Sequence, residues 1–123
     1  MSYPIKETVS ITTDSSGDAT SYSEVVNGRI LTIIYTKTDY AAGVDFTITT
    51  ETTAQGLWTE SNVNASATKA PRQPTHDAVG AASLYAAAGE AVEDYIWAVQ
   101  ERVKIVIDEG GDTKTGSFDI IVG

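Results

Sequence analysis

The stretch GRILTIIYTKTD, from Gly28 to Asp39, decides the fold class because apolar side chains occur at five of the six positions 30–35. Successive side chains of a β-strand point to opposite faces, so these residues divide between two faces. One face holds Ile30, Thr32 and Ile34, and the other holds Leu31, Ile33 and Tyr35. A strand that is apolar on both faces is typical of the middle of a covered sheet. We therefore predict a central strand, covered by a facing sheet on one side and by a loop, an arm or a second subunit on the other.

The composition of the whole chain also favours a β domain. Its 123 residues include 11 Ile, 11 Val and 17 Thr but only 3 Leu. β-Branched side chains lose rotamer freedom in a helix and pack well on a pleated sheet. A chain of this length suits one domain with a single modest core. We therefore expect residues 1–123 to form one all-β domain.

Turn-forming residues divide the chain into short candidate strands about ten residues apart. The candidate strands are ETVSITTD (7–14), ATSYSEVV (19–26), the opening stretch, VDFTITTETT (44–53), the region 95–107 and SFDIIV (117–122). Asn27-Gly28 is a strong hairpin signal, and DEGGDTKTG (108–116) reads as a hairpin loop. About seven to nine short strands with this spacing are typical of a two-sheet sandwich or a jelly roll.

Two segments are expected to be irregular. Residues 54–79 show no sustained period, and the prolines of PRQP (71–74) are incompatible with a central strand. We expect a short strand at Leu57-Trp58 followed by a long excursion, which in a small domain usually serves a function. Residues 1–8 are expected to include an N-terminal arm.

The region 78–100 allows two interpretations. Its many alanines favour a helix by intrinsic propensity. Against this, Gly80 and Gly89 interrupt the run, and Tyr95, Trp97 and Val99 alternate as in a strand. We prefer strands for this region and keep the helix as the alternative.

The net charge of −9 limits the class of partner. Phosphate backbones and anionic membrane surfaces attract basic proteins, so we expect no direct nucleic-acid partner and no membrane partner. No apolar run approaches the ~18 residues of a membrane span, and the N-terminal residues do not resemble a signal peptide. The absence of Cys excludes disulfides, thiolate metal sites and Cys nucleophiles. The sequence also lacks the P-loop and G-x-G-x-x-G motifs, and we expect no cofactor.

The single histidine, His76, is the residue around which a hydrolase would be built. His76-Asp77 is a possible half of a triad, with Ser66 or Ser83 as nucleophile. Adjacent loop residues rarely orient one another in this way, and the G-x-S-x-G nucleophile pattern is absent. We therefore favour a loop histidine that caps a turn over a catalytic one.

Two acidic turns are candidates for a calcium site. Asp14 and Asp18 belong to one turn, and Asp108-Glu109 and Asp112 belong to the other. Ca²⁺ takes oxygen ligands from such loops, but neither turn has the spacing of an EF-hand. Acidic residues are also common in hairpin turns, and we expect no metal site here.

The aromatic residues suggest a protein interface. The chain has six Tyr and two Trp but only two Phe, and several fall in expected loops or strand ends. Exposed Tyr and Trp often anchor interfaces, although they can also form the rim of a small core. Our candidate interface consists of Tyr3, Tyr40, Trp58, Arg72 and His76.

Over most of residues 28–123, the chain resembles small virion proteins of tailed bacteriophages, and two stretches carry the resemblance. They are GLWTESNVNASATKAPRQPTHDAVGAASLYAAAGE (56–90) and ERVKIVIDEGGDTKTGSFDIIVG (101–123), and the likeness lies in the Thr-rich strands, the PRQPTH loop and the Ile/Val-rich terminal hairpin. The resemblance implies a non-enzymatic β-sandwich or jelly-roll module that forms a homo-oligomer. Its role would be that of a capsid cement or decoration protein bound to the major capsid protein, or of a head-to-tail connector or tail component. Such a protein is in the host cytoplasm during assembly and then in the virion.

A function of another class, the binding of a carbohydrate or a receptor, remains open. A carbohydrate- or receptor-binding β-sandwich would use exposed aromatic rings, here Trp58 and Tyr40, as stacking platforms. A small hydrolase centred on His76 is the interpretation that the sequence favours least.

Overall fold

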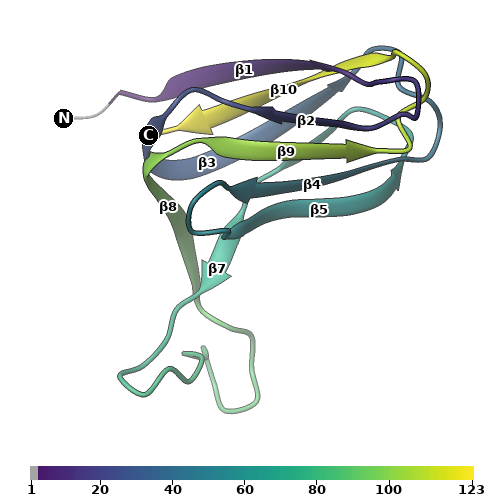
Figure 1. The fold of residues 1–123 in the computed structure, drawn as a ribbon. Coiled ribbons are helices and arrows are strands. Elements are labelled where there is room, and N and C mark those ends of the chain that lie inside the picture. The colour runs from purple at the N-terminus through teal and green to yellow at the C-terminus, as the bar shows by residue number, and fades with distance from the viewer. Residues whose placement is uncertain (1–2) are drawn as a thin grey trace.

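The computed structural model describes residues 3–123, and this range contains ten β-strands and no helix (Figure 1). The strands are β1 (Ile5–Thr12), β2 (Ala19–Tyr22), β3 (Val26–Lys37), β4 (Val44–Thr50), β5 (Gly56–Val63), β6 (Ala67–Lys69), β7 (Arg72–Pro74), β8 (Glu93–Glu101), β9 (Val103–Asp108) and β10 (Thr115–Val122). The prediction of an all-β fold is confirmed. The number of strands exceeds the expected seven to nine because β6 and β7 lie in the segment that was expected to be irregular.

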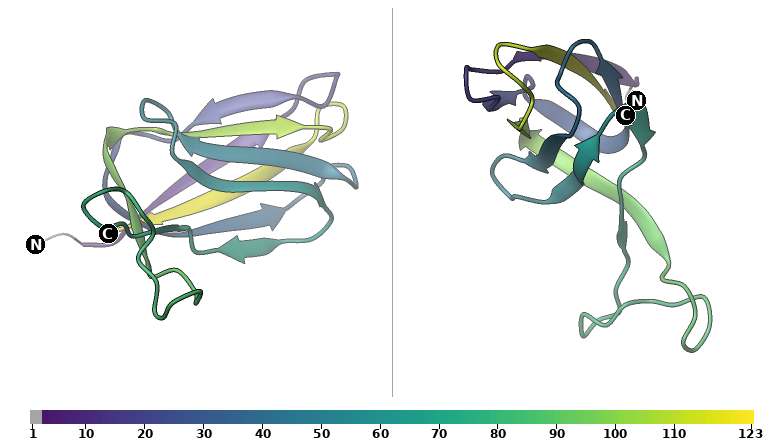
Figure 2. Two further views of the ribbon diagram at one scale, coloured as in Figure 1. Left: turned by 90° about the horizontal axis from the view of Figure 1, so that it is seen from below. Right: turned by 90° about the vertical axis from the view of Figure 1, so that its right-hand side faces the viewer.

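The strands form two antiparallel sheets packed as a sandwich (Figures 1 and 2). The six-stranded sheet has the order β1-β10-β3-β8-β7, with β6 paired to the end of β3. The four-stranded sheet has the order β2-β9-β4-β5. Buried residues of both sheets contribute to one hydrophobic core between them.

β3 contains residues 28–37 of the stretch GRILTIIYTKTD and is central, as predicted, because it pairs with β10 on one edge and with β8 and β6 on the other. The predicted division of its side chains between two faces is only partly right. The pairing register shifts between Ile121 and Val122, so that Ile30, Ile33 and Tyr35 are all fully buried. Leu31, Thr32 and Ile34 are half-buried, and no further layer of strands or helices covers them within residues 3–123.

Aromatic rings fill the middle of the sandwich. Phe46 of β4 lies 5.0 Å from Tyr35, 5.1 Å from Phe118 and 4.9 Å from Trp58, measured between ring centroids. Tyr40, from the β3–β4 loop, stacks on Tyr35 and donates a hydrogen bond from its hydroxyl to the Ile11 carbonyl at 2.7 Å. Rings at these separations add directional packing to the burial of apolar surface.

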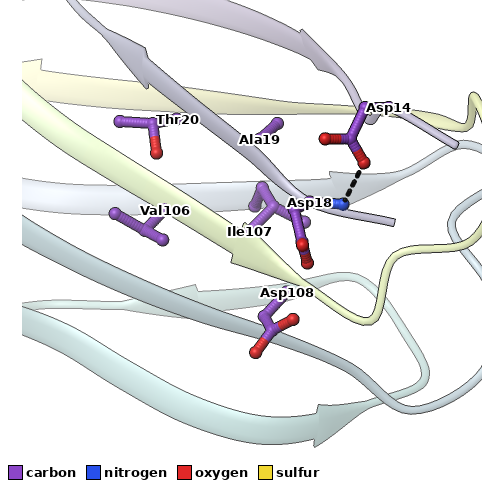
Figure 3. A pocket seen from close by; sticks show the side chains of 7 residues that line it. All are labelled: Asp14, Asp18, Ala19, Thr20, Val106, Ile107 and Asp108. Atoms are coloured by element: carbon purple, nitrogen blue, oxygen red, sulfur yellow. Dashed lines mark hydrogen bonds between the residues drawn. The ribbon is translucent and has the colours of Figure 1, made fainter. Parts of the chain in front are cut away.

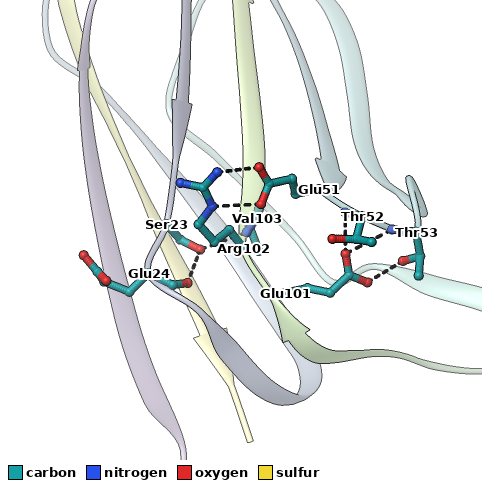
Figure 4. A network of polar contacts seen from close by, with 8 residues as sticks. All are labelled: Ser23, Glu24, Glu51, Thr52, Thr53, Glu101, Arg102 and Val103. Atoms are coloured by element: carbon teal, nitrogen blue, oxygen red, sulfur yellow. Dashed lines mark hydrogen bonds and ion pairs between the residues drawn. The ribbon is translucent and has the colours of Figure 1, made fainter.

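The chain passes from one sheet to the other at Arg102, between β8 and β9 (Figure 4). The Glu101 carboxylate is buried here and accepts hydrogen bonds from the Thr52 and Thr53 amides at 2.7 and 3.1 Å and from the Thr53 hydroxyl. Arg102 forms a two-point ion pair with Glu51. These contacts join the β4–β5 turn to the crossover.

The segment expected to be irregular, residues 54–79, is more ordered than predicted, and part of the region expected to form strands is less regular. Residues 54–79 contain β5, β6 and β7, and β7 is at the edge of its sheet, as its prolines require. In the region 78–100, the preference for strands is right for β8, whereas residues 78–92 form neither a regular strand nor a helix.

The expected N-terminal arm is also shortened. Residues 5–8 pair with β10 as the first half of β1, so only Tyr3 and Pro4 precede the strand among the described residues. Residues 1 and 2 lie outside the described range.

Candidate interaction surface

The most distinctive feature outside the sandwich is a two-stranded extension, residues 72–95, which we call the projection. Residues 96–101 of β8 belong to the sandwich, where positions 96, 97, 98 and 101 pair with β3, whereas residues 93–95 pair with β7. Figures 1 and 2 show β7 and this end of β8 leading away from the sandwich to a long loop. This loop, residues 75–92, is called the tip.

The tip has a defined backbone of two small turns. The Asp77 carboxylate accepts hydrogen bonds from the Val79 and Ala81 amides at 2.9 and 3.0 Å and closes the first turn. The second turn is closed by the Gly89 amide, which donates to the Ala86 carbonyl at 2.8 Å. The turns are joined where the Ser83 amide donates to the Thr75 carbonyl and the Ser83 carbonyl accepts from the Val92 amide. Among the described residues, the tip forms hydrogen bonds only with itself.

The tip is apolar but exposed. Of residues 78–92, eleven are Ala, Val, Leu or Tyr, and Glu90 is the one charged residue. No residue of the tip is buried, and the exposed fractions of Val79, Tyr85 and Leu84 are 88%, 75% and 44%. Contiguous exposed apolar residues of this kind mark sites of protein–protein contact. The tip is therefore the strongest candidate interaction surface of the described chain.

A stack of three side chains holds the base of the projection against the sandwich. The guanidinium carbons of Arg72 and Arg29 lie 4.1 and 4.9 Å from the centroid of the Tyr95 ring. Arg72 also donates to the Leu31 carbonyl at 3.3 Å, and Arg29 donates to the Gly123 carbonyl at 3.0 Å. Because Arg29 belongs to β3, Arg72 to β7 and Tyr95 to β8, the stack fixes the direction in which the projection leaves the sandwich.

A second apolar feature lies at the end of the sandwich where β1 begins. A pocket of about 140 Å³ is lined by Ile5, Glu7, Val25, Val26, Asn27 and Val122. Ile5 and Val25 at its rim are 56% and 58% exposed, whereas Val122 is buried. We call this the mouth pocket. Trp97 and Val99 of β8 are also exposed, and the neighbouring Gln100 amide donates to the Asn27 side chain at 2.7 Å.

Two residues of the candidate interface are in the wrong place for that role. Tyr40 and Trp58 are 2% and 6% exposed, and both belong to the core. Tyr40 lies in a loop, as predicted, but the loop turns its ring into the sandwich, where Gly116 leaves the space that the ring occupies. Trp58 is on β5, and its indole N–H donates to Glu60 at 2.8 Å. The position of Tyr40 in a loop therefore did not indicate exposure, and neither did the position of Trp58 in a short predicted strand.

The other three candidate residues lie at or near the surface but do not form one patch. Tyr3 is 76% exposed near the start of β1. Arg72 is half-buried in the stack at the base of the projection, and His76 is exposed at the start of the tip. The sequence analysis missed Val79, Leu84 and Tyr85. The available signal was an apolar run that follows neither a helix period nor a strand period.

The structure does not assemble the possible catalytic triad. The Asp77 carboxylate closes its own turn, and the Ser66 hydroxyl accepts a hydrogen bond from the Lys37 amide at 2.9 Å. Within residues 3–123, no hydrogen bond joins His76 to a carboxylate or a hydroxyl group.

The acidic turns do come together, at the far end of the sandwich from the mouth pocket (Figure 3). Asp14, Asp18 and Asp108 line an open hollow of about 410 Å³, together with residues of β2 and β9. The neighbouring Asp108 carboxyl, and to a lesser degree burial, raises the pKa of Asp18. The Asp14 carboxylate is used by the Ser16 and Asp18 amides, at 2.9 and 3.0 Å. No group of three or more His, Asp or Glu side chains within residues 3–123 is arranged to hold a metal ion.

Comparisons with known proteins give no further assignment. No protein-family model, no curated protein and no solved structure matches this chain. Residues 3–123 also contain no helix that is long and apolar enough to cross a membrane. The fold and the exposed surfaces are therefore the basis for a functional assignment.

Proposed function

We propose that this chain is a non-enzymatic structural protein that binds other protein subunits through the tip of its projection. The observation that carries the proposal is the exposure of Val79, Leu84 and Tyr85 on an extension whose base is held in place. Burying such side chains against a partner is favourable by about 25 cal/mol per Å² of apolar surface. A pre-ordered extension also reduces the conformational entropy lost on binding.

Within this class, we propose a bacteriophage capsid cement or decoration protein that binds the major capsid protein and is located in the virion. The support is the resemblance of residues 56–90 and 101–123 to small virion proteins, together with the net charge of −9. An acidic surface complements basic patches on shell subunits and is repelled by packaged DNA. A head-to-tail connector or tail component is the second assignment, since it would use the same surfaces.

The carbohydrate-binding alternative has lost its support. It depended on Tyr40 and Trp58 as stacking platforms, and both rings are buried in the core. Of the two tryptophans, Trp97 on β8 is the exposed one, with an exposed fraction of 55%.

Co-sedimentation with empty bacteriophage capsid shells tests the proposal. We expect the wild-type protein to sediment with the shells and a Val79→Ser/Leu84→Ser/Tyr85→Ser variant to stay in the supernatant. Tyr22→Ser is the control because Tyr22 is an exposed tyrosine on β2, in the four-stranded sheet. Equal binding of the tip variant and the wild type would show that the tip is not the binding element. Absence of binding to shells, connectors and tails alike would overturn the virion assignment.

A further inference from the structure

The mouth pocket and the tip are complementary in size and chemistry. An apolar cavity of about 150 Å³ holds a benzene-sized group, so a pocket of about 140 Å³ accepts one aromatic side chain. Its walls are apolar at Ile5, Val25, Val26 and Val122, while Glu7 and Asn27 supply polar atoms. A ring with a polar end suits such a lining better than an aliphatic side chain does. The tip exposes one residue of this kind, Tyr85.

The tip and the mouth pocket of one molecule do not meet. The stack of Arg29, Tyr95 and Arg72 holds the base of the projection on the sandwich. Figures 1 and 2 show the tip at the far end of the projection, away from the end of the sandwich where β1 begins and β10 finishes. The pocket can therefore accept Tyr85 only from another molecule.

Charge opposes this contact between copies less than it opposes a contact through the acidic ends of the sandwich. Each chain has a net charge of −9, and Asp14, Asp18 and Asp108 concentrate negative charge at the opposite end of the sandwich. By contrast, Glu7 is the one charged residue that lines the pocket, and the tip has two carboxylates, Asp77 and Glu90, of which Asp77 accepts hydrogen bonds from two amides of its own turn. Two copies that meet tip to pocket therefore keep the acidic ends of the two sandwiches apart.

We propose that the tip of one copy binds the mouth pocket of a second copy, with Tyr85 as the inserted side chain. The inference rests on the proposed function, because it names the partner of the same tip. The two contacting surfaces are different, so the interface is heterologous and produces a closed ring or an open chain of copies. Attachment to a shell then belongs to the assembled oligomer, and the loss of Tyr85 weakens attachment through lost multivalency.

Sedimentation equilibrium over a range of protein concentrations tests the inference. The wild type is expected to self-associate, and Tyr85→Ala is expected to raise the dissociation constant by roughly 30-fold, as for truncation of an aromatic anchor. Val25→Asp places a charge at the pocket rim and is expected to have a similar effect. Tyr22→Ala is the matched control, because Tyr22 is also an exposed tyrosine but lies on β2, outside the tip and outside the lining of the mouth pocket. Ile5→Asp, at the same rim, replaces Val25→Asp if that variant does not fold.

Mixing the two defective variants identifies the type of interface. Val25→Asp retains an intact tip and Tyr85→Ala retains an intact pocket, so an equimolar mixture should form dimers but nothing larger. Self-association of Val25→Asp alone would overturn the inference, because it would indicate contact between two tips. A wild type that is monomeric at every concentration but binds shells through the tip would also overturn it, and the proposed function would stand. A protein that forms the head-to-tail oligomer but does not bind shells would support the inference and overturn the assignment to a capsid-binding protein.

Discussion

Tyr35 and Tyr40 stack in the core with their ring centroids 6.2 Å apart and their planes 12° from parallel, but their hydroxyl groups differ in hydrogen bonding. The Tyr40 hydroxyl donates to the Ile11 carbonyl at 2.7 Å. The buried Tyr35 hydroxyl has no partner among the protein atoms of residues 3–123. Burial raises the pKa of both phenols, so both remain protonated at neutral pH.

Replacing each tyrosine by phenylalanine should therefore change stability in opposite directions. Tyr40→Phe removes the buried hydrogen bond to the Ile11 carbonyl, which costs about 0.5–1.5 kcal/mol. Tyr35→Phe removes an unpaired buried hydroxyl and should leave the free energy of unfolding unchanged or raise it by about 1 kcal/mol. Denaturant unfolding at pH 7 measures both values. A clear loss of stability in Tyr35→Phe would contradict the absence of a partner.

The close packing of the Tyr40 ring against Gly116 leads to a second prediction. A Cβ added at Gly116 would lie 2.8 Å from Cδ2 of Tyr40, closer than side-chain atoms pack. Gly116→Ala should therefore displace the ring and lower the free energy of unfolding by about 1–3 kcal/mol. Gly56→Ala is the control, because a Cβ at Gly56 meets nothing within 4 Å. Similar unfolding midpoints for the two variants would show that Tyr40 moves without cost.

The core of this fold was predictable because it follows local patterns. The alternation of Val44, Phe46 and Ile48 placed all three in the core, where they are fully buried. The central position of β3 followed from its apolar character on both faces. Its bulge did not, since a register shift depends on the partner strand β10 and leaves no mark within the β3 sequence itself.

The candidate interface was less predictable, because exposure of a loop residue depends on where the loop turns. Tyr40 and Trp58 carry no local sign that they enter the core. The tip was misread for a related reason: strands were preferred for it and a helix was the alternative, but two turns closed by Asp77 and Gly89 override both preferences. Propensity describes isolated segments, whereas these turns are set by side-chain capping and by contacts between sequence-distant residues.

The stack at the base of the projection gives a prediction about local dynamics. Tyr95→Ala removes the ring between Arg29 and Arg72, and we expect faster hydrogen exchange at tip amides such as those of Ser83 and Val92. Exchange in the core of β3 should be unchanged. Tyr95→Phe retains the aromatic face and should exchange like the wild type. Slow exchange at the tip in Tyr95→Ala would mean that strand pairing alone orders the projection.

The acidic end of the sandwich gives a prediction about pH. The folded state raises the pKa of Asp18 above its ordinary value of 3.8, mainly through the Asp108 carboxyl. A raised pKa means that the folded state binds this proton more tightly, so the associated stability is lost as pH rises through the folded pKa. Asp18→Asn should therefore raise the melting temperature at pH 7 and leave it unchanged at pH 3. Asp112→Asn, which removes the same charge from the β9–β10 turn, controls for net charge. Equal effects of the two variants would argue against a specific Asp18–Asp108 interaction.

The stability that Glu101 contributes depends on pH in the opposite direction. The hydrogen bond from the Thr53 hydroxyl, with those from the Thr53 and Thr52 amides, lowers the pKa of Glu101 below its ordinary value of 4.5. Its stabilisation is therefore present above that ordinary value and is lost as pH falls through the folded pKa. Glu101→Gln should be less stable than the wild type at pH 7, and the difference should shrink in acid, where the wild-type carboxyl is protonated.

Glu101→Ala separates the charge of Glu101 from its role as a hydrogen-bond acceptor. This variant leaves the Thr52 and Thr53 amides without their acceptor at any pH, so a loss of about 1–3 kcal/mol should persist in acid. Thermal unfolding of the three proteins between pH 3 and pH 7 measures these differences. If Glu101→Gln matched the wild type across that range, the carboxylate charge would have no part in joining the β4–β5 turn to the crossover.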